Sequence, residues 1–425
     1  MTGGCFDLVL RGGGERRNHL DYIYYLMLFV LLILQFAVTQ VRCRQMSTFA
    51  SLLSEVSSLP LPKQRAIAAC VGACVADAAA RPFHWLYDGE KLESILSEAG
   101  PSVDSAFFPR SCSPYYTLPT GANSCYYDLG FTMLKSLSKY GDDEKYLGLQ
   151  GAVTANLHEM FGPGSEYRKA FERRNEKYDP SKRYDKRDPI DGPWQQSSVT
   201  VFLESASGNP ASKETDGLVS TLPLIAHLAA SGPITPEGQE LIRSLASTLS
   251  TNVFALSHTL SAALILSSVI RSGEGSIVKS DSVRAAVAQV DPAVLSRAAA
   301  APGQEGVPHG PDLVLAELDA VFAAAAADPT GSDHVAQVLG WGKPCANPGS
   351  FQGAIHAVMT STSFAEGVRR NIRAGGCNCS RANLAGSILG AAFLFDESRG
   401  GIPHEWLLKA DKGEEVFRLA LEKFR

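Results

Sequence analysis

The chain has 425 residues, of which 45% are hydrophobic and 20% are charged, and its formal net charge is -5 at pH 7. This composition is typical of a globular protein and excludes an extended disordered chain. A mildly acidic chain is not an evident nucleic-acid binder, because the basic residues of the stretch 167–188 alternate with Asp and Glu and predict a solvated loop. The nine cysteines are scattered, so we expect reduced thiols.

The N-terminal part contains one long apolar segment. Residues 22–41 carry no charge and are long enough for a slightly short membrane-spanning helix. Arginines flank the segment on both sides, so its orientation stays open. We expect a membrane anchor between a flank at 1–21 and a linker at 42–62. A signal peptide is the competing interpretation, and a translation start at Met46 would give a cytoplasmic protein.

From residue 63 to residue 425 the pattern is helical throughout. Apolar residues recur at steps of three and four without sustained alternation, which predicts one all-α domain. Many of these segments are rich in Ala, Gly and Ser, which favours close helix packing in a compact multi-helix globule. The clearest helical segments are 65–80, 129–141, 144–161, 217–230, 238–270, 314–327 and 381–395. Irregular stretches at 102–123, 162–192 and 328–349 are long loops of the kind that often carry function.

The first polar interruption of a helical pattern is Asp77, which stands among alanines. A carboxylate is costly to bury there unless it is paired, hydrogen-bonded or linked to a metal. A cap at the end of a helix is the alternative explanation. His84 follows at the end of the same segment, where a lone histidine is more often a core or loop residue than a ligand.

A second polar turn runs from Thr120 into a helical segment that begins near Cys125. Either Ser124 or Asp128 could cap this helix.

The third polar segment places Gly375 and Gly376 directly before Cys377, Asn378, Cys379 and Ser380. Backbone amides at the start of the following helix could face an anion or another ligand. Two thiols at a helix start also lie where the helix dipole lowers the pKa of a thiol. A glycine turn with an Asn or Ser cap and two incidental cysteines is the alternative.

Together the three segments resemble the ADP-ribosylglycohydrolase family, in the branch of the J-type crystallins and selenoprotein J. The family motif G-D-A-x-G-x-x-x-E is similar to residues 76–84, where Asp77 matches and His84 replaces the glutamate. The motifs T-D-D-T and G-G-D-T-D-T resemble residues 124–127 and 375–380, but their aspartates are absent here. The branch's strings ADAAAxPxHW and AGGxNxSRA occur at 76–85 and 374–382, and the resemblance covers about 65–408.

The resemblance implies a helical fold and a hydrolase that holds magnesium with these acids. Magnesium demands oxygen ligands. If the segments converge, the pocket instead offers a soft-metal set of His84, Cys125, Cys377 and Cys379. We therefore expect magnesium-dependent hydrolysis to be badly weakened or lost, unless Asp77 or Asp128 alone holds one ion.

The sequence leaves several roles open for the candidate residues and three functions open for the protein. The candidate catalytic residues are Asp77, His84, Asp128 and Cys379, and the candidate ligand-binding residues are Ser124, Gly375, Gly376, Asn378 and Ser380. The first functional hypothesis is a residual glycohydrolase or a binder of an ADP-ribose-type small molecule. The second is a non-catalytic crystallin-like scaffold. The third is a soft-metal site or a thiol redox site that pairs Cys125 with Cys377 or Cys379.

Overall fold

The computed structural model describes residues 47–139, 146–176, 188–273 and 278–425, together with Tyr24, Leu26, Met27 and Val30. Apart from those four residues, the expected anchor at 22–41 and its flank lie outside the described residues. The chain divides into two compact units, Met1–Ser54 and Glu55–Arg425. The description below concerns the second unit.

Helices form nearly all the regular structure of this unit, which confirms the all-α prediction. Within the described residues the strands are β1 (Tyr116–Thr117) and β2 (Ile190–Asp191), which pair in parallel with Tyr116 opposite Ile190. In chain order the helices are α2 (Leu61–Ala80), η1 (Arg81–Phe83), α3 (Gly89–Ala99), α4 (Cys125–Ser138), α5 (Leu149–Phe161), α6 (Glu166–Glu176), α7 (Ser197–Ser205), α8 (Asp216–Ser231), α9 (Pro236–Ala246), α10 (Val253–Arg271), α11 (Ser280–Val287), α12 (Pro292–Ala299), α13 (Pro311–Ala327), α14 (His334–Trp341), α15 (Gly349–Met359), α16 (Phe364–Arg373), α17 (Asn378–Phe393), η4 (Glu397–Arg399), α18 (His404–Lys409) and α19 (Gly413–Phe424).

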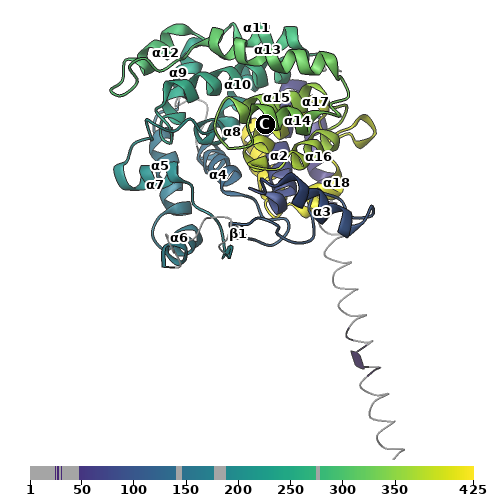
Figure 1. Ribbon diagram of the computed structural model, residues 1–425. Helices are drawn as coiled ribbons and strands as arrows, with labels where there is room; N and C mark the ends of the chain where they lie inside the picture. The colour runs from purple at the N-terminus through teal and green to yellow at the C-terminus, as the bar shows by residue number, and fades with distance from the viewer. Residues whose placement is uncertain are drawn as a thin grey trace, which may run out of the picture. The chain divides into compact units, whose positions relative to one another are not determined.

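Helices α2 and α17 pack side by side in the core of the unit (Figure 1). Glycines make the close approach possible, since a Cβ atom on Gly72 would lie 2.3 Å from the carbonyl oxygen of Gly386. A Cβ atom on Gly386 would lie 2.5 Å from the Cβ of Ala76. The small residues seen in the sequence therefore let two backbones meet, as expected.

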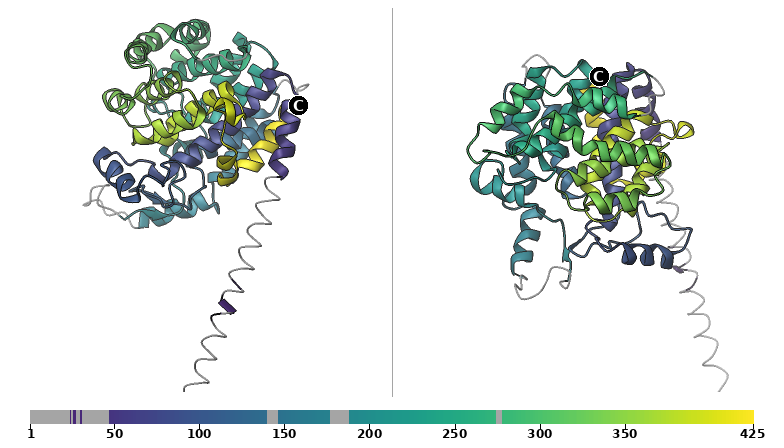
Figure 2. Two further views of the ribbon diagram at one scale, coloured as in Figure 1. Left: turned by 90° about the vertical axis from the view of Figure 1, so that its right-hand side faces the viewer. Right: turned by 45° about the horizontal axis from the view of Figure 1, so that its top comes forward.

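The remaining helices surround this pair. Helices α8, α10, α15, α16 and α19 contact it directly, and α9, α11, α12 and α13 pack on or around α10 (Figure 1). Figure 2 shows the early purple and late yellow helices lying together, and α19 packs on α2 although they are far apart in the sequence. This arrangement brings the end of α2 to the starts of α4 and α17.

Three expectations about the elements need correction. The helical run at 238–270 is two helices, because Asn252 caps α10 by accepting hydrogen bonds from the amides of Phe254 and Ala255. The stretch 162–192, expected to be irregular, contains α6, and the stretch 328–349 contains α14. Both helices are short, and α6 is strongly charged, so neither shows an extended apolar stripe in the sequence.

Two of the described helical segments, Leu61–Phe83 and Val253–Arg271, are long and apolar enough to cross a membrane. Their apolar windows are 100% and 94% buried within the protein. Their apolar character is therefore explained by their place in the core.

Candidate functional site

The structure brings the three polar segments together. The amide of Trp85 donates to the carbonyl oxygen of Gly376 at 2.8 Å, and the amide of Gly376 donates to Leu86 at 2.7 Å. The first segment is therefore joined to the third by two backbone hydrogen bonds. The amide of Ser124 donates to Asp77 Oδ1 at 2.7 Å, which joins the first segment to the second.

Asp77 is fully buried, and its carboxylate is satisfied by neutral donors. Oδ1 accepts from Ser124 N and from Asn123 Nδ2 at 3.1 Å. Oδ2 accepts from Ser124 Oγ at 2.6 Å and from Asn383 Nδ2 at 3.0 Å. Burial raises the pKa of Asp77, and these hydrogen bonds only partly oppose that rise. Each oxygen already accepts two hydrogen bonds, so Asp77 ties α2 to the starts of α4 and α17.

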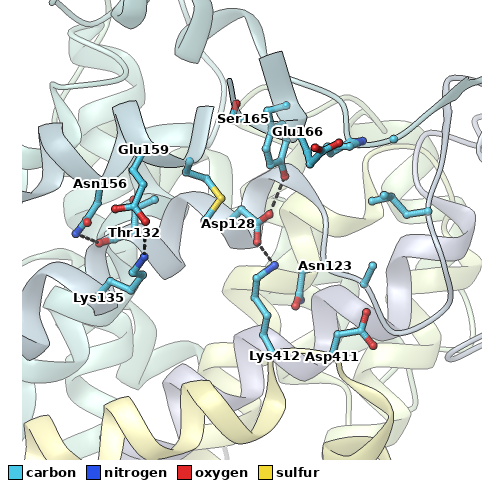
Figure 3. A pocket seen from close by; sticks show the side chains of 16 residues that line it. Asn123, Asp128, Thr132, Lys135, Asn156, Glu159, Ser165, Glu166, Asp411 and Lys412 are labelled. Carbon is cyan, nitrogen blue, oxygen red and sulfur yellow. Dashed lines mark hydrogen bonds and ion pairs between the residues drawn. The ribbon is translucent and has the colours of Figure 1, made fainter. Parts of the chain in front are cut away.

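Asp128 lies beside this junction and lines a cavity of about 560 Å³, called the larger cavity here, whose lining also includes Asn123 (Figure 3). Its Oδ1 accepts from Lys412 Nζ at 2.7 Å and its Oδ2 accepts from Tyr167 Oη at 2.8 Å. Burial lowers the pKa of Lys412, but the charge and hydrogen bond of Asp128 outweigh that effect and raise it. Asp128 is thus one half of an ion pair, and Ser124 caps α4 by accepting from the amide of Tyr126.

Gly375 and Gly376 have structural roles in the turn before α17. Both have a left-handed backbone, with φ angles of 65° and 63°. A Cβ atom on Gly376 would lie 2.7 Å from the carbonyl oxygen of Lys343, and one on Gly375 would lie 2.7 Å from that of Leu86. Only glycine fits both the conformation and the close approach.

Asn378 and Ser380 likewise bind the protein itself. Asn378 Nδ2 donates to the carbonyl oxygen of Ala80 at 3.0 Å. Ser380 Oγ donates to the carbonyl oxygen of Cys377 at 2.9 Å and lies 3.1 Å from Ser350 Oγ. These contacts fix the start of α17 against the end of α2.

The side chains of His84 and Cys377, two residues of the predicted set, are in contact. His84 Nε2 lies 3.6 Å from Cys377 Sγ, while His84 Nδ1 is hydrogen-bonded to Tyr116 Oη at 2.6 Å. The indole Nε1 of Trp85 donates to Cys377 Sγ at 3.2 Å. Histidine, tyrosine and tryptophan side chains therefore hold one buried sulfur atom in place.

A second sulfur, that of Cys345, completes this cluster and was not singled out by the sequence. Burial raises the pKa of Cys377, but hydrogen bonds with Cys345 and His84 and the electrostatic interaction with His84 lower it well below its usual value. The hydrogen bond with Cys377, together with burial, raises the pKa of Cys345 well above its usual value. The two cysteines therefore influence each other, with the pKa of Cys377 lowered and that of Cys345 raised.

The other two predicted cysteines do not complete a metal centre. Cys379 Sγ turns toward the carbonyl oxygen of Asp77, 3.8 Å away, and burial raises its pKa well above the usual value. Burial does the same for Cys125. Across the described ranges no group of three or more His, Cys, Asp or Glu side chains is placed to hold a metal ion. His84, Cys125, Cys377 and Cys379 are thus not assembled as one four-ligand site.

Cys345 opens onto a second cavity of about 400 Å³, called the aromatic cavity here. Its walls combine aromatic rings with amide, hydroxyl and charged groups. Trp85 and Trp194 meet edge to face with ring centroids 5.6 Å apart, and the guanidinium of Arg174 lies 4.4 Å from the centroid of Trp194. The lining residues are Trp85, Tyr126, Phe171, Arg174, Trp194, Gln195, Gln196, Ser197, Thr200, Val201, Glu214 and Cys345.

One carboxyl group, that of Glu214, lines this cavity, and the buried Asp216 is hydrogen-bonded to the lining residue Gln196. Burial raises the pKa of Glu214, although its hydrogen bond with Cys345 opposes the rise. Burial and the neighbouring charge of Glu214 raise the pKa of Asp216 well above its usual value. Asp216 accepts hydrogen bonds from Gln196 Nε2 at 2.8 Å and from Ser198 Oγ. Burial therefore raises the pKa of both carboxyl groups beside Cys345.

The sequence carried only a partial signal for these additional residues. Cys345 lies within the stretch 328–349, which the Pro, Gly and aromatic content had marked as a functional loop. Its partner is distant in the chain, and no local motif links the two cysteines. Glu214 lies two residues before the start of α8. Its place beside the segment of Cys345 becomes visible only in the structure, where Glu214 and Ala346 form an isolated bridge.

The family of this protein is shown by a match between its sequence and a family model. Residues 58–425 match the model of the family described as ADP-ribosylglycohydrolase, and the chain therefore belongs to that family. This confirms the resemblance stated from the motifs.

Two curated relatives are crystallins from Tripedalia cystophora. Crystallin J1A is 28% identical over 364 residues, which are 84% of this chain and 95% of the relative. Crystallin J1B is 25% identical over 370 residues, which are 85% of this chain and 97% of the relative. A solved structure described as an ADP-ribosylglycohydrolase-related protein complex matches with a TM-score of 0.50 and 19% identity, covering 86% of this chain and 99% of its own. That likeness supports the fold.

Proposed function

We propose that this member of the ADP-ribosylglycohydrolase family binds a small molecule of the ADP-ribose type but does not carry out magnesium-dependent hydrolysis of ADP-ribose conjugates. The observation that carries the proposal is the donor set where the three segments meet. His84, Cys377 and Cys379 stand where the family motifs have acids. Nitrogen and sulfur donors do not fit magnesium, which requires oxygen ligands in near-octahedral geometry.

The two acids that remain do not compensate for this loss. The two carboxylate oxygens of Asp77 together accept four hydrogen bonds from neutral groups. Asp128 is paired with Lys412 and faces the larger cavity. A magnesium ion at either carboxylate would have to displace these partners, so the residues present do not fit the family's metal.

The aromatic cavity supports the binding half of the proposal. Rings of Trp85 and Trp194 offer apolar faces and edges for a flat heterocycle. Arg174 supplies a guanidinium at the same wall, and such a group suits a phosphate. Among the described residues, Gln195 Oε1 and Gln196 Oε1 are buried without a hydrogen-bond partner. A ligand with N–H or O–H groups would satisfy them.

A non-catalytic scaffold is the second candidate. It is supported by the naming of both relatives as crystallins and by the use of Asp77, Asn378 and Ser380 in internal contacts. Under this alternative the aromatic cavity would bind no nucleotide-like ligand.

Calorimetric titration of ADP-ribose into the purified full-length protein separates these candidates. We expect saturable binding that is equal in EDTA and in magnesium. Arg174→Ala should weaken it at least tenfold, about 1.4 kcal/mol. Arg173→Ala is the matched control, because Arg173 lies on the same helix and donates to the backbone of Asp191 instead. Absence of binding in every condition would overturn the proposal in favour of the scaffold.

A further inference from the structure

We propose that Cys345 and Cys377 form a reversible thiol–disulfide site, which reacts with small disulfides that enter the aromatic cavity. The site shares the aromatic cavity with the proposed ligand of the ADP-ribose type, but its reaction does not require that ligand. It also differs from the pairings expected from the sequence, which joined Cys125 to Cys377 or Cys379.

The backbone holds the two cysteines close together. The amide of Cys377 donates to the carbonyl oxygen of Lys343 at 2.9 Å, so the segment that carries Cys345 runs beside the start of α17. The carbonyl oxygen of Cys345 accepts from the amide of Thr215 at 3.2 Å, which fixes it from the other side. Both cysteines are free thiols, and each side chain shifts the pKa of the other, which is consistent with the closeness that the backbone contacts impose.

Access to the two sulfurs is unequal. Cys345 is half-buried and lines the aromatic cavity, whereas Cys377 is fully buried behind it. Trp85 Nε1 and His84 Nε2 contact the Cys377 sulfur from within the protein. An incoming disulfide therefore meets Cys345 first, and Cys377 is placed to attack the product.

The reaction balances with a small disulfide, RSSR, as the oxidant. Cys345 loses its proton to solvent, and its thiolate attacks one sulfur of RSSR. This forms a mixed disulfide and expels RS⁻, which is protonated from solvent. The Cys377 thiolate then attacks the Cys345 sulfur, forms the internal disulfide and expels the second RS⁻, which is protonated from solvent. Two protein thiols are oxidised, and one RSSR is reduced to two RSH.

The surroundings favour the reduced state. Trp85, His84 and the Cys345 thiol all stabilise the sulfur of Cys377 as a thiolate. A stabilised thiolate makes the corresponding disulfide easier to reduce. We therefore expect dithiothreitol to reduce the Cys345–Cys377 disulfide readily. The pair would then be oxidised and reduced reversibly as the supply of small disulfides and thiols changes.

Other described cysteines offer a built-in comparison. Cys70, Cys74, Cys125 and Cys379 are buried, and burial raises the pKa of each thiol. Cys112 is half-buried, and its Sγ lies 3.7 Å from the carbonyl oxygen of Arg110. Cys112 therefore serves as the matched accessible thiol without a partner thiol on the cavity wall.

The test treats reduced full-length protein with bis(2-hydroxyethyl) disulfide, alkylates the remaining thiols and maps the peptides by mass spectrometry. We expect a peptide pair joined through Cys345 and Cys377, reversed by dithiothreitol. Cys377→Ser should trap the mixed disulfide on Cys345. Cys345→Ser should slow oxidation of Cys377 at least about tenfold. Cys112→Ser should leave the joined pair unchanged.

Two results would overturn the proposal. One is a disulfide that joins Cys377 to Cys125 or Cys379 instead of Cys345. The other is a Cys345 that reacts no faster than Cys112 in the wild-type protein, a measurement that stands even if a serine variant fails to fold. Because the readout contains neither ADP-ribose nor magnesium, its failure is distinct from a failure of the proposed ligand binding.

Discussion

Replacing Asp77 by asparagine tests whether this carboxylate is a structural group or a metal ligand. The side-chain amide introduced by Asp77→Asn would put a donor where one carboxylate oxygen now accepts two hydrogen bonds. Two donors of Asn123, Ser124 or Asn383 would then face another donor inside the core. Each buried donor left without a partner costs about 1–3 kcal/mol.

The expected loss in the free energy of unfolding is about 2–4 kcal/mol, because burying a neutral amide instead of a charge offsets part of the penalty. The assay is chemical denaturation followed by tryptophan fluorescence, in EDTA and in excess magnesium. The loss should be the same in both. Asp319→Asn is the control, since its ion pair with Arg284 is solvent-exposed, and it should change stability by less than about 1 kcal/mol.

The reasoning fails if magnesium stabilises the wild-type protein and Asp77→Asn abolishes that effect. A ligand at a hundredfold excess over its dissociation constant stabilises the folded state by about 2.7 kcal/mol. A shift of this size would be unmistakable. It would show that Asp77 binds the ion and that the four hydrogen bonds are an apo arrangement.

Three other perturbations probe the core, the larger cavity and the response to acid. Lys412→Met removes the partner of buried Asp128 and should cost about 1–3 kcal/mol in chemical denaturation. Gly386→Ala places a Cβ atom 2.5 Å from the carbonyl oxygen of Gly72 and should cost about 3 kcal/mol or reduce the soluble yield. Burial lowers the pKa of His334 and His356 below the usual 6.5, so their stability contribution is full above pH 6.5. Unfolding measured from pH 7 to pH 5 should show a stability that falls as the pH drops below 6.5, by at most about 1.4 kcal/mol per pH unit for each histidine.

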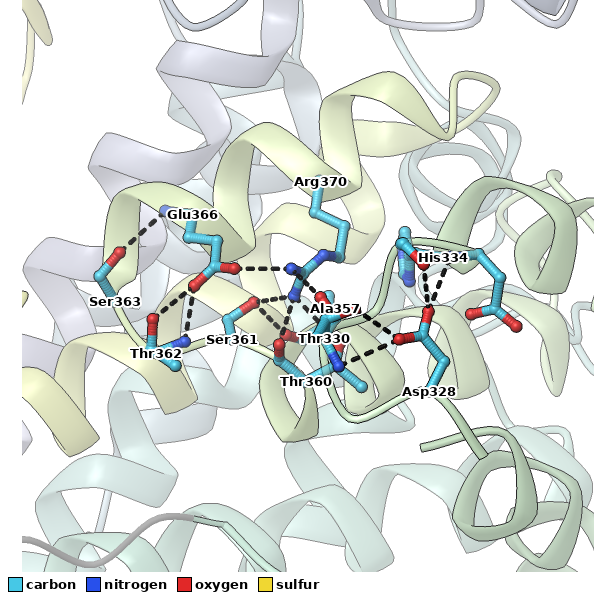
Figure 4. Close-up of polar contacts among 12 residues, drawn as sticks. Asp328, Thr330, His334, Ala357, Thr360, Ser361, Thr362, Ser363, Glu366 and Arg370 are labelled. Carbon is cyan, nitrogen blue, oxygen red and sulfur yellow. Dashed lines mark hydrogen bonds and ion pairs between the residues drawn. The ribbon is translucent and has the colours of Figure 1, made fainter. Parts of the chain in front are cut away.

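Controls for these perturbations come from the same chain. Figure 4 shows the polar network of Asp328 and Arg370 that adjoins His334. Arg370 and Arg381 lower the pKa of His334 further, so protonation stays unfavourable in the folded state. His334→Gln should reduce the acid slope, while His309→Gln, at an exposed position, should leave it unchanged. Equal slopes in both variants would contradict the acid prediction, and an unaltered stability of Lys412→Met would contradict the ion-pair argument.

The sequence predicted the helical core because its signal is local. The alanines and glycines of 65–80 and 381–395 show both the helices and the small surfaces that let α2 and α17 meet. Helix α6 was missed because its eleven residues have a strongly polar average and almost no apolar stripe. Helix α14 was missed because it is only eight residues long within a loop-like composition.

The site was predictable only in part for a related reason. Motif order located Asp77, His84 and Cys377, and hydrogen bonding by neutral donors proved to be the explanation for the buried Asp77. Cys345 became visible only through tertiary structure, because its neighbour Lys343 pairs with Cys377 across distant parts of the chain. Spacing within a sequence carries no information about such a contact.

The most direct test of the central claim is the release of ADP-ribose from a modified substrate by the full-length protein, measured across a magnesium titration. The account predicts release no faster than in a blank without protein at every magnesium concentration, while ADP-ribose still binds. Release that rises with magnesium and saturates would contradict it, because it would show that His84, Cys377 and the remaining acids support the chemistry that their donor atoms argue against.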